Sequence, residues 1–187
     1  ITSLPSAVSG GAMTLLSTQT ASSSATIDFT SNIDDTYNEY VFKFINIHPA
    51  TDQVQFKAGF RDGGSSYDAT KTTTAFYSYH KEDDSATALS YDTGSDLAQS
   101  TGSQVVLSQM GNDNDQNSSG YLHLFAPSNT TFVKHFIGRG SVCMDADAIV
   151  DWYVAGYCNV TAAIDGVQFS MSSGNIDSGV IKLYGIS

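Results

Sequence analysis

Basic side chains, helical periodicity and long apolar runs are all scarce in this sequence. Lys and Arg total 8 against 19 Asp and Glu, which gives the 187-residue chain a formal net charge of −11. Binding to nucleic acid or to an anionic membrane needs clustered cations, so the sequence predicts neither partner. No apolar run approaches the roughly 20 residues that cross a bilayer, and no basic-then-apolar leader is visible.

Residue combinations that carry catalysis are missing as well. The sequence contains no G-x-S-x-G elbow, no HExxH pair and no CxxC pair. A glycan depolymerase would need two converging carboxyl groups, and the sequence shows no pattern that identifies such a pair. We therefore predict a protein that is not an enzyme and needs no cofactor. The histidines are dispersed, which favours packed or interfacial roles over a metal centre; they are His48, His80, His123 and His135.

Cysteine is nearly absent, with Cys143 and Cys158 as the only two. A hairpin between them would bring the two side chains near each other, so a disulfide is geometrically conceivable. Two buried free thiols are an equally good interpretation, because cysteine often behaves as a small hydrophobic residue. The sequence leaves both states open.

What the sequence does have is alternation of apolar and polar residues with a period of two. Residues 25–29, 54–60 and 167–171 show it most clearly. Successive strand side chains point to opposite faces, so each segment has one apolar face that a second layer must cover. Turn signals recur every eight to twelve residues, and no helix of useful length is predicted.

These observations predict an all-β fold, an antiparallel β-sandwich of jelly-roll type with about ten strands. Residues 13–187 form the single domain, and the small, polar residues 1–12 form an arm that orders on contact with a neighbour. Residues 81–103 are predicted as a projecting loop containing a short strand. Residues 140–148 are predicted as a connector.

One strand, residues 40–47, is apolar on both faces and predicts a central strand or one that meets a partner subunit. Together with the terminal strand, residues 180–186, it is expected to pack the core and the subunit interface, and the predicted assembly is a homotrimer. The interface residues predicted on these two strands are Tyr40, Phe42, Phe44, Ile181, Leu183 and Tyr184.

Tyrosines offer a different function, since flat rings with a polar tip stack on sugars. Tyr77, Tyr79 and Tyr91 are the predicted glycan-binding residues. The same rings are also typical of cores and subunit interfaces, which we favour. Asp113 and Asp115 lie in a loop whose composition suits Ca²⁺, but the EF-hand spacing fails and Asn and Asp are also ordinary turn residues.

Four segments carry a family resemblance: YVFKFINIHP at 40–49, GNDNDQ at 111–116, SNTTFVKHF at 128–136 and SGNIDSGVIKLYGI at 173–186. They resemble an uncharacterised family of virion structural proteins from tailed bacteriophages, especially marine ones. The resemblance implies no activity and no catalytic residues. Residues 138–150 fit the family pattern least and are predicted as a variable loop.

The sequence therefore predicts a virion structural protein, a capsid-decoration or tail-fibre-type subunit that binds other virion proteins. Its location would be the extracellular particle. The alternative is a receptor- or carbohydrate-binding module at a fibre tip, which would hold a host surface glycan. A secreted cellular lectin is a further alternative, which the phage-like segments disfavour.

Overall fold

The computed structural model describes residues 13–187, so the predicted arm at residues 1–12 lies outside the described part. Within it the chain forms twelve strands and no helix long and apolar enough to cross a membrane. The strands are β1 (Met13–Ser24), β2 (Thr26–Phe29), β3 (Glu39–Pro49), β4 (Val54–Arg61), β5 (Lys71–Lys81), β6 (Thr87–Tyr91), β7 (Gln104–Met110), β8 (Ser118–Phe125), β9 (Lys134–Met144), β10 (Ala148–Cys158), β11 (Gly166–Met171) and β12 (Ile176–Ile186).

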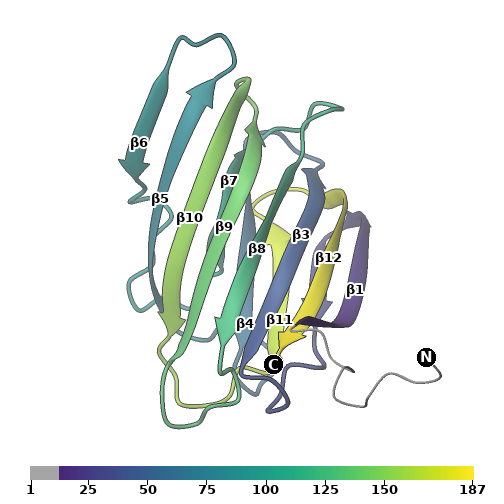
Figure 1. Ribbon diagram of the computed structural model, residues 1–187, viewed down its shortest axis with the longest axis vertical. Helices are drawn as coiled ribbons and strands as arrows, with labels where there is room; N and C mark the ends of the chain where they lie inside the picture. Colours follow the sequence, from purple (N-terminus) through teal and green to yellow (C-terminus); the bar gives the residue numbers. More distant parts are fainter. Residues whose placement is uncertain (1–12) are drawn as a thin grey trace, which may run out of the picture.

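Every strand pairing between these elements is antiparallel. The front layer in Figure 1 runs in the order β6-β5-β10-β9-β8-β3-β12-β1. The second layer, behind it, runs in the order β7-β4-β11-β2. One pair of residues, Met110 on β7 and Met144 on β9, joins the two layers into a single, nearly closed sheet.

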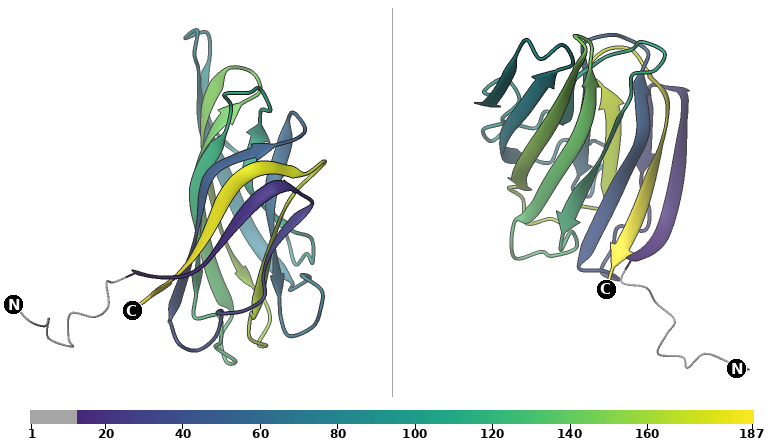
Figure 2. Two further views of the ribbon diagram at one scale, coloured as in Figure 1. Left: turned by 90° about the vertical axis from the view of Figure 1, so that its right-hand side faces the viewer. Right: turned by 45° about the horizontal axis from the view of Figure 1, so that its top comes forward.

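The pairing order is concentric along the chain. β1 pairs with β12, β2 with β11, β3 with β8 and β4 with β7. Two hairpins, β5–β6 and β9–β10, are inserted into this pattern and extend the front layer at one end (Figure 1). At the other end, β1 leads through one residue into β2, so the chain passes from one layer to the other (Figure 2).

The core lies between the two layers and is rich in phenylalanine. The Phe169 ring on β11 lies 5.2 to 6.1 Å, centroid to centroid, from four other rings. Two of these rings, Phe42 and Phe44, come from the front layer, and two, Phe29 and Phe56, come from the second layer. Edge-to-face and stacked contacts of this kind add to the stabilisation from burial alone, so this cluster holds the layers together.

A bulge on β3 explains why that strand is apolar on both sides. Asn46 has a positive φ of 52°, and the pairing of β3 with β8 shifts register between Phe44 and Ile47. The bulge turns Ile47 inward, where it is fully buried. Before the bulge, Val41 faces outward but is only 1% exposed, because it lies between its register partners on β8 and β12.

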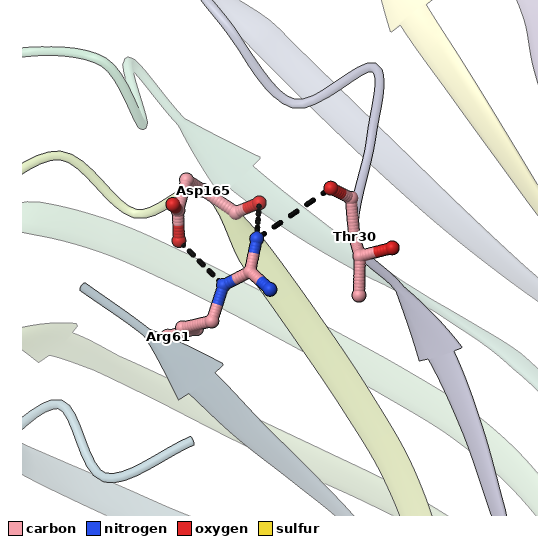
Figure 3. A network of polar contacts seen from close by, with 3 residues as sticks. All are labelled: Thr30, Arg61 and Asp165. Carbon is pink, nitrogen blue, oxygen red and sulfur yellow. Dashed lines mark hydrogen bonds and ion pairs between the residues drawn. The ribbon is translucent and has the colours of Figure 1, made fainter. Parts of the chain in front are cut away.

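Polar contacts close the end of the second layer. Arg61, the last residue of β4, donates from Nε to Oδ1 of Asp165 at 2.8 Å and from Nη2 to the Asp165 carbonyl at 3.0 Å (Figure 3). The same Nη2 also donates to the Thr30 carbonyl at 3.5 Å. One guanidinium thereby ties together the ends of β2, β4 and β11.

The all-β, antiparallel prediction is confirmed, but the strand number and the shape are not those of a ten-stranded sandwich. Residues 140–148, predicted as a connector and as part of a variable loop, instead form the tip of the long β9–β10 hairpin. Glycine and serine in that segment suggested a loop, yet Gly140 is an inward position that pairs with Trp152. The alternating side chains of the hairpin outweigh its low β propensity.

The cysteines do not face each other. Cys143 pairs with Ile149 and Cys158 with Lys134, at opposite ends of the β9–β10 hairpin. Both thiols are free. Of the two states that the sequence left open, the structure therefore has the free thiols.

Candidate functional surface

Exposed apolar side chains gather on the side of the front layer that faces away from the core, which we call the outer face. On β9 buried inward residues alternate with exposed outward ones from Lys134 to Val142. Residues that pair with the outward residues of β9 on the neighbouring strands point to the same side, so the outer face continues across those strands. Apart from Phe132, which lies on a loop, every large apolar side chain that is exposed in residues 13–187 lies on it: Met13, Leu15, Ile45, Phe76, Leu89, Tyr91, Tyr121, Ile137 and Ile149.

A row of aromatic and cationic side chains crosses the middle of the outer face. Phe76 on β5 pairs with Tyr91 on β6 and with Tyr153 on β10. Tyr153 pairs with Arg139 on β9, which in turn pairs with Tyr121 on β8. The strands in this order can be followed from β6 to β8 in Figure 1. We call these five residues the central row.

Within the central row the flat groups stack on one another. The rings of Phe76 and Tyr153 lie 4.7 Å apart with an interplanar angle of 4°. The guanidinium carbon of Arg139 lies 4.8 Å from the centroid of the Tyr153 ring. Tyr153 therefore has a neighbour in the row on each side, and its edge, not its face, is offered outward.

Asp151 compensates the positive charge of the row. Arg139 donates from Nε and Nη2 to the two carboxylate oxygens of Asp151, at 2.9 and 2.8 Å. The Tyr153 hydroxyl donates to the same carboxylate at 3.0 Å. The hydrogen bond from Arg139 lowers the pKa of Asp151, and desolvation raises the pKa of the Tyr153 hydroxyl. These bonds fix the orientation of the stacked side chains.

Two shallow depressions flank the central row. One, of about 460 Å³, lies between Tyr121, Ser141 and Ile149. The other, of about 470 Å³, lies along Ile137 and Tyr157 on the opposite side of the row. Both are open to solvent, so they suit protruding side chains of a partner better than an enclosed small molecule.

The residues predicted for a subunit interface are mostly in the core. Tyr40, Phe42, Phe44, Ile181 and Leu183 are 2% exposed or less. The sequence assigned these two strands to the core and to the subunit interface together. In the folded subunit these five side chains pack the core and are not exposed. The subunit interface itself stays a prediction. Only Tyr184 lies on the outer face, where the Lys43 amine lies 5.8 Å from its ring.

The residues predicted for glycan binding are divided between two faces. Tyr77 and Tyr79 point inward from β5, and the Tyr77 ring stacks on buried Trp152 at 5.7 Å. Tyr91 lies on the outer face, with its hydroxyl donating to Asp96 at 2.7 Å. The structure therefore does not bring the three rings together.

The predicted calcium loop connects β7 and β8. The Gln116 side chain accepts a hydrogen bond from the Asp113 backbone N–H at 3.1 Å and donates to the Met144 carbonyl at 3.3 Å. Among the described residues, no group of three or more His, Cys, Asp or Glu side chains is placed to hold a metal ion. The Ca²⁺ prediction at Asp113 and Asp115 stays a prediction.

A buried cationic cluster was not predicted from the sequence. Lys71 and Lys134, both 0% exposed, flank Cys158 in register on the inner face. The Lys71 amine donates to the Ala69 carbonyl at 2.6 Å, and the Lys134 amine donates to the Val160 carbonyl at 2.6 Å. Burial lowers the pKa of both amines and raises the pKa of the Cys158 thiol to about 12. Lysines that open strands resemble ordinary edge charges, so no sequence signal marked them.

Comparison with known proteins finds no relative. No protein-family model, no curated protein and no solved structure matches this chain. The outer face, the central row and the strand order are the observations on which a functional proposal rests.

Proposed function

We propose that this chain is a structural subunit of a tailed-bacteriophage virion, of capsid-decoration or tail-fibre type, and that its outer face binds a neighbouring virion protein. The observation that carries the proposal is the collection of exposed apolar side chains on that one face. Large contiguous apolar patches are uncommon on monomers and mark interaction surfaces. The family resemblance supplies the virion context.

The composition of the outer face suits a protein partner. Aromatic residues and arginine are enriched at protein interfaces, and the central row consists of them. Three of its side chains, Phe76, Tyr153 and Arg139, are held by stacking and by Asp151 before a partner arrives, so these side chains lose little entropy on binding.

Strand order supports the same proposal. With the two inserted hairpins set aside, the first strand pairs with the last, the second with the second-last, and so on inward. We infer that this framework is a jelly roll, an architecture used in viral capsids and in lectins. Because one fold serves many functions, the strand order supports the proposal without deciding between these two uses.

The rival function is a receptor- or carbohydrate-binding module at a fibre tip. Sugar recognition by aromatic residues relies on open ring faces. In the central row, the stacking of Phe76, Tyr153 and Arg139 occupies faces that a sugar would need. The geometry therefore favours a protein partner, and binding of the purified chain on a glycan array would favour the rival.

Particle occupancy tests the proposal. Ile137, half exposed in the second depression, is replaced in Ile137→Glu, and copies per particle are counted by quantitative mass spectrometry. Burying an unpaired carboxylate in an apolar contact is strongly unfavourable. We expect the subunit concentration that half-fills the particle to rise by about tenfold or more, the effect of losing roughly 1.4 kcal/mol of binding free energy, so occupancy falls when the subunit is limiting.

Phe132→Glu is the matched control, because Phe132 is a large exposed apolar residue outside the outer face. The control should leave occupancy at the parental level. Full occupancy with Ile137→Glu, in a variant that folds normally by circular dichroism, would show that the outer face is not the attachment surface.

A further inference from the structure

The edge strand β6 has properties that the outer face does not explain. Among residues 13–187 it pairs only with β5, and every one of its five residues is exposed, with Leu89 at 76%. None of its residues is charged or proline. Free edges are normally protected by lysine, proline or a bulge, because they template pairing with another chain. β6 lacks each of these protections.

The backbone of β6 offers its hydrogen-bonding groups at three positions. The N–H of Lys81 donates to the Ala86 carbonyl, and the N–H of Asp92 donates to the Ala75 carbonyl. Hydrogen-bonded pairs alternate along an antiparallel ladder, so Ala88 and Ser90 direct their backbone groups to β5. The N–H and C=O of the intervening residues therefore point to the free edge: these residues are Thr87, Leu89 and Tyr91.

We infer that β6 pairs with β6 of a second copy of this chain, antiparallel and about a twofold axis at Leu89. In that register Leu89 faces Leu89 of the second copy, and Thr87 faces Tyr91 at both ends. All three outward-facing backbone positions then form hydrogen-bonded pairs. The two front layers become one continuous sheet, and the exposed Leu89 side chains contact each other.

The free edge itself favours a second copy as the occupant, because its three outward-facing backbone positions lie symmetrically about Leu89 and one twofold axis pairs all of them. Each copy has a formal net charge of −11, which opposes association in general. The five residues of β6 are uncharged, so the paired strands place no like charges directly opposite one another, and the carboxylates that flank them at 82–84 and 92 make the pairing sensitive to salt. The other end of the front layer, β1, is also uncharged, but β1 buries Ala21 and leads directly into β2. β6 buries no side chain, so a partner strand would supply burial that it lacks.

Disulfide trapping tests the register. In a Cys143→Ser background, Leu89→Cys is incubated with oxidised glutathione and examined on a non-reducing gel. Hydrogen-bonded antiparallel residues have Cα atoms about 5.5 Å apart, which a disulfide spans. We expect a cross-linked dimer from Leu89→Cys alone. Thr87→Cys alone should stay monomeric on the gel, and a mixture of Thr87→Cys with Tyr91→Cys should cross-link. Cross-linking of Thr87→Cys by itself, or none with Leu89→Cys, would overturn the register.

Sedimentation tests the pairing itself, because Leu89→Pro removes only an N–H that points to the free edge. We expect the parent to sediment as a dimer that added salt strengthens. Leu89→Pro should weaken dimerisation by at least about tenfold, because the substitution is present in both copies and the Leu89 pair loses both of its hydrogen bonds. Ala88→Pro, which removes a bond to β5, should instead lower the melting temperature.

A monomeric parent, or the trimer expected from the sequence, would contradict the inference. Since β6 pairs through its edge, these results are independent of particle occupancy by Ile137→Glu.

Discussion

Phe169 shows how strongly a single residue can contribute to this fold. Its ring is fully buried and contacts aromatic rings from both layers. Removing a ring from such a site loses the burial and leaves a cavity that the surrounding strands cannot close.

We predict that Phe169→Ala lowers the free energy of unfolding by about 3–5 kcal/mol, measured by urea denaturation. Phe132→Ala is the control, since that side chain is 69% exposed and its loss should change stability by about 0.5 kcal/mol or less. Equal effects of the two substitutions would contradict the position of Phe169 in the core.

The buried lysines make stability depend on pH. Burial lowers the pKa of Lys71 in the folded protein, whereas the unfolded chain has a lysine pKa of about 10.4. Between these two values the folded state binds fewer protons than the unfolded state, so the contribution of Lys71 to stability rises with pH.

We therefore expect the unfolding free energy of Lys71→Met, relative to that of the parent, to be highest at neutral pH. It should fall progressively as the pH approaches about 10.4. The measurement is the difference in unfolding free energy between variant and parent at several pH values. Lys43→Met, at an exposed position, is the control for losing a charge. A difference that does not change with pH for Lys71→Met would show that the amine is not buried as described.

At the scale of elements, the β9–β10 hairpin is the part that most determines the outer face. It supplies Arg139, Tyr153 and Asp151, and it also carries buried Trp152 and Val142 on its inward side. The inward side needs small residues where the layers approach closely. At Gly140, a Cβ would overlap the Leu107 side chain on β7.

We predict that Gly140→Ala lowers the free energy of unfolding by about 1–3 kcal/mol through overpacking. Leu107→Ala removes the atoms that a Cβ at position 140 would overlap. In the double variant Gly140→Ala with Leu107→Ala, the loss of unfolding free energy should therefore be smaller than the sum of the two single losses. Additive effects in a double-mutant cycle would contradict this contact.

The sequence predicted the strands better than their faces. Alternation at residues 54–60 and 167–171 marked β4 and β11 correctly, because both strands have one side in the core. It did not reveal how far the strands of the β9–β10 hairpin extend, because serine and glycine at residues 140–148 resemble a loop. Nor did it show which face of β5 carries Tyr77, since that depends on Trp152 in a different strand. The central row depends on the register of five strands, which no local pattern contains.

At the scale of the whole molecule, the front layer extends beyond the second layer. One side of it packs the core, while the opposite side collects apolar and stacked aromatic residues. A rigid sheet with a preformed outer face is suited to assembly by surface complementarity, and its acidic net charge keeps other surfaces apart.

A cryo-electron microscopy map of the intact particle, at a resolution that orients this subunit, tests the central claim most directly. The proposal predicts that the strands β5, β8, β9 and β10 lie against a neighbouring virion protein, with Arg139 and Ile137 in the contact. A map in which that side of the sheet faces solvent, while the subunit is attached through other surfaces, would contradict it.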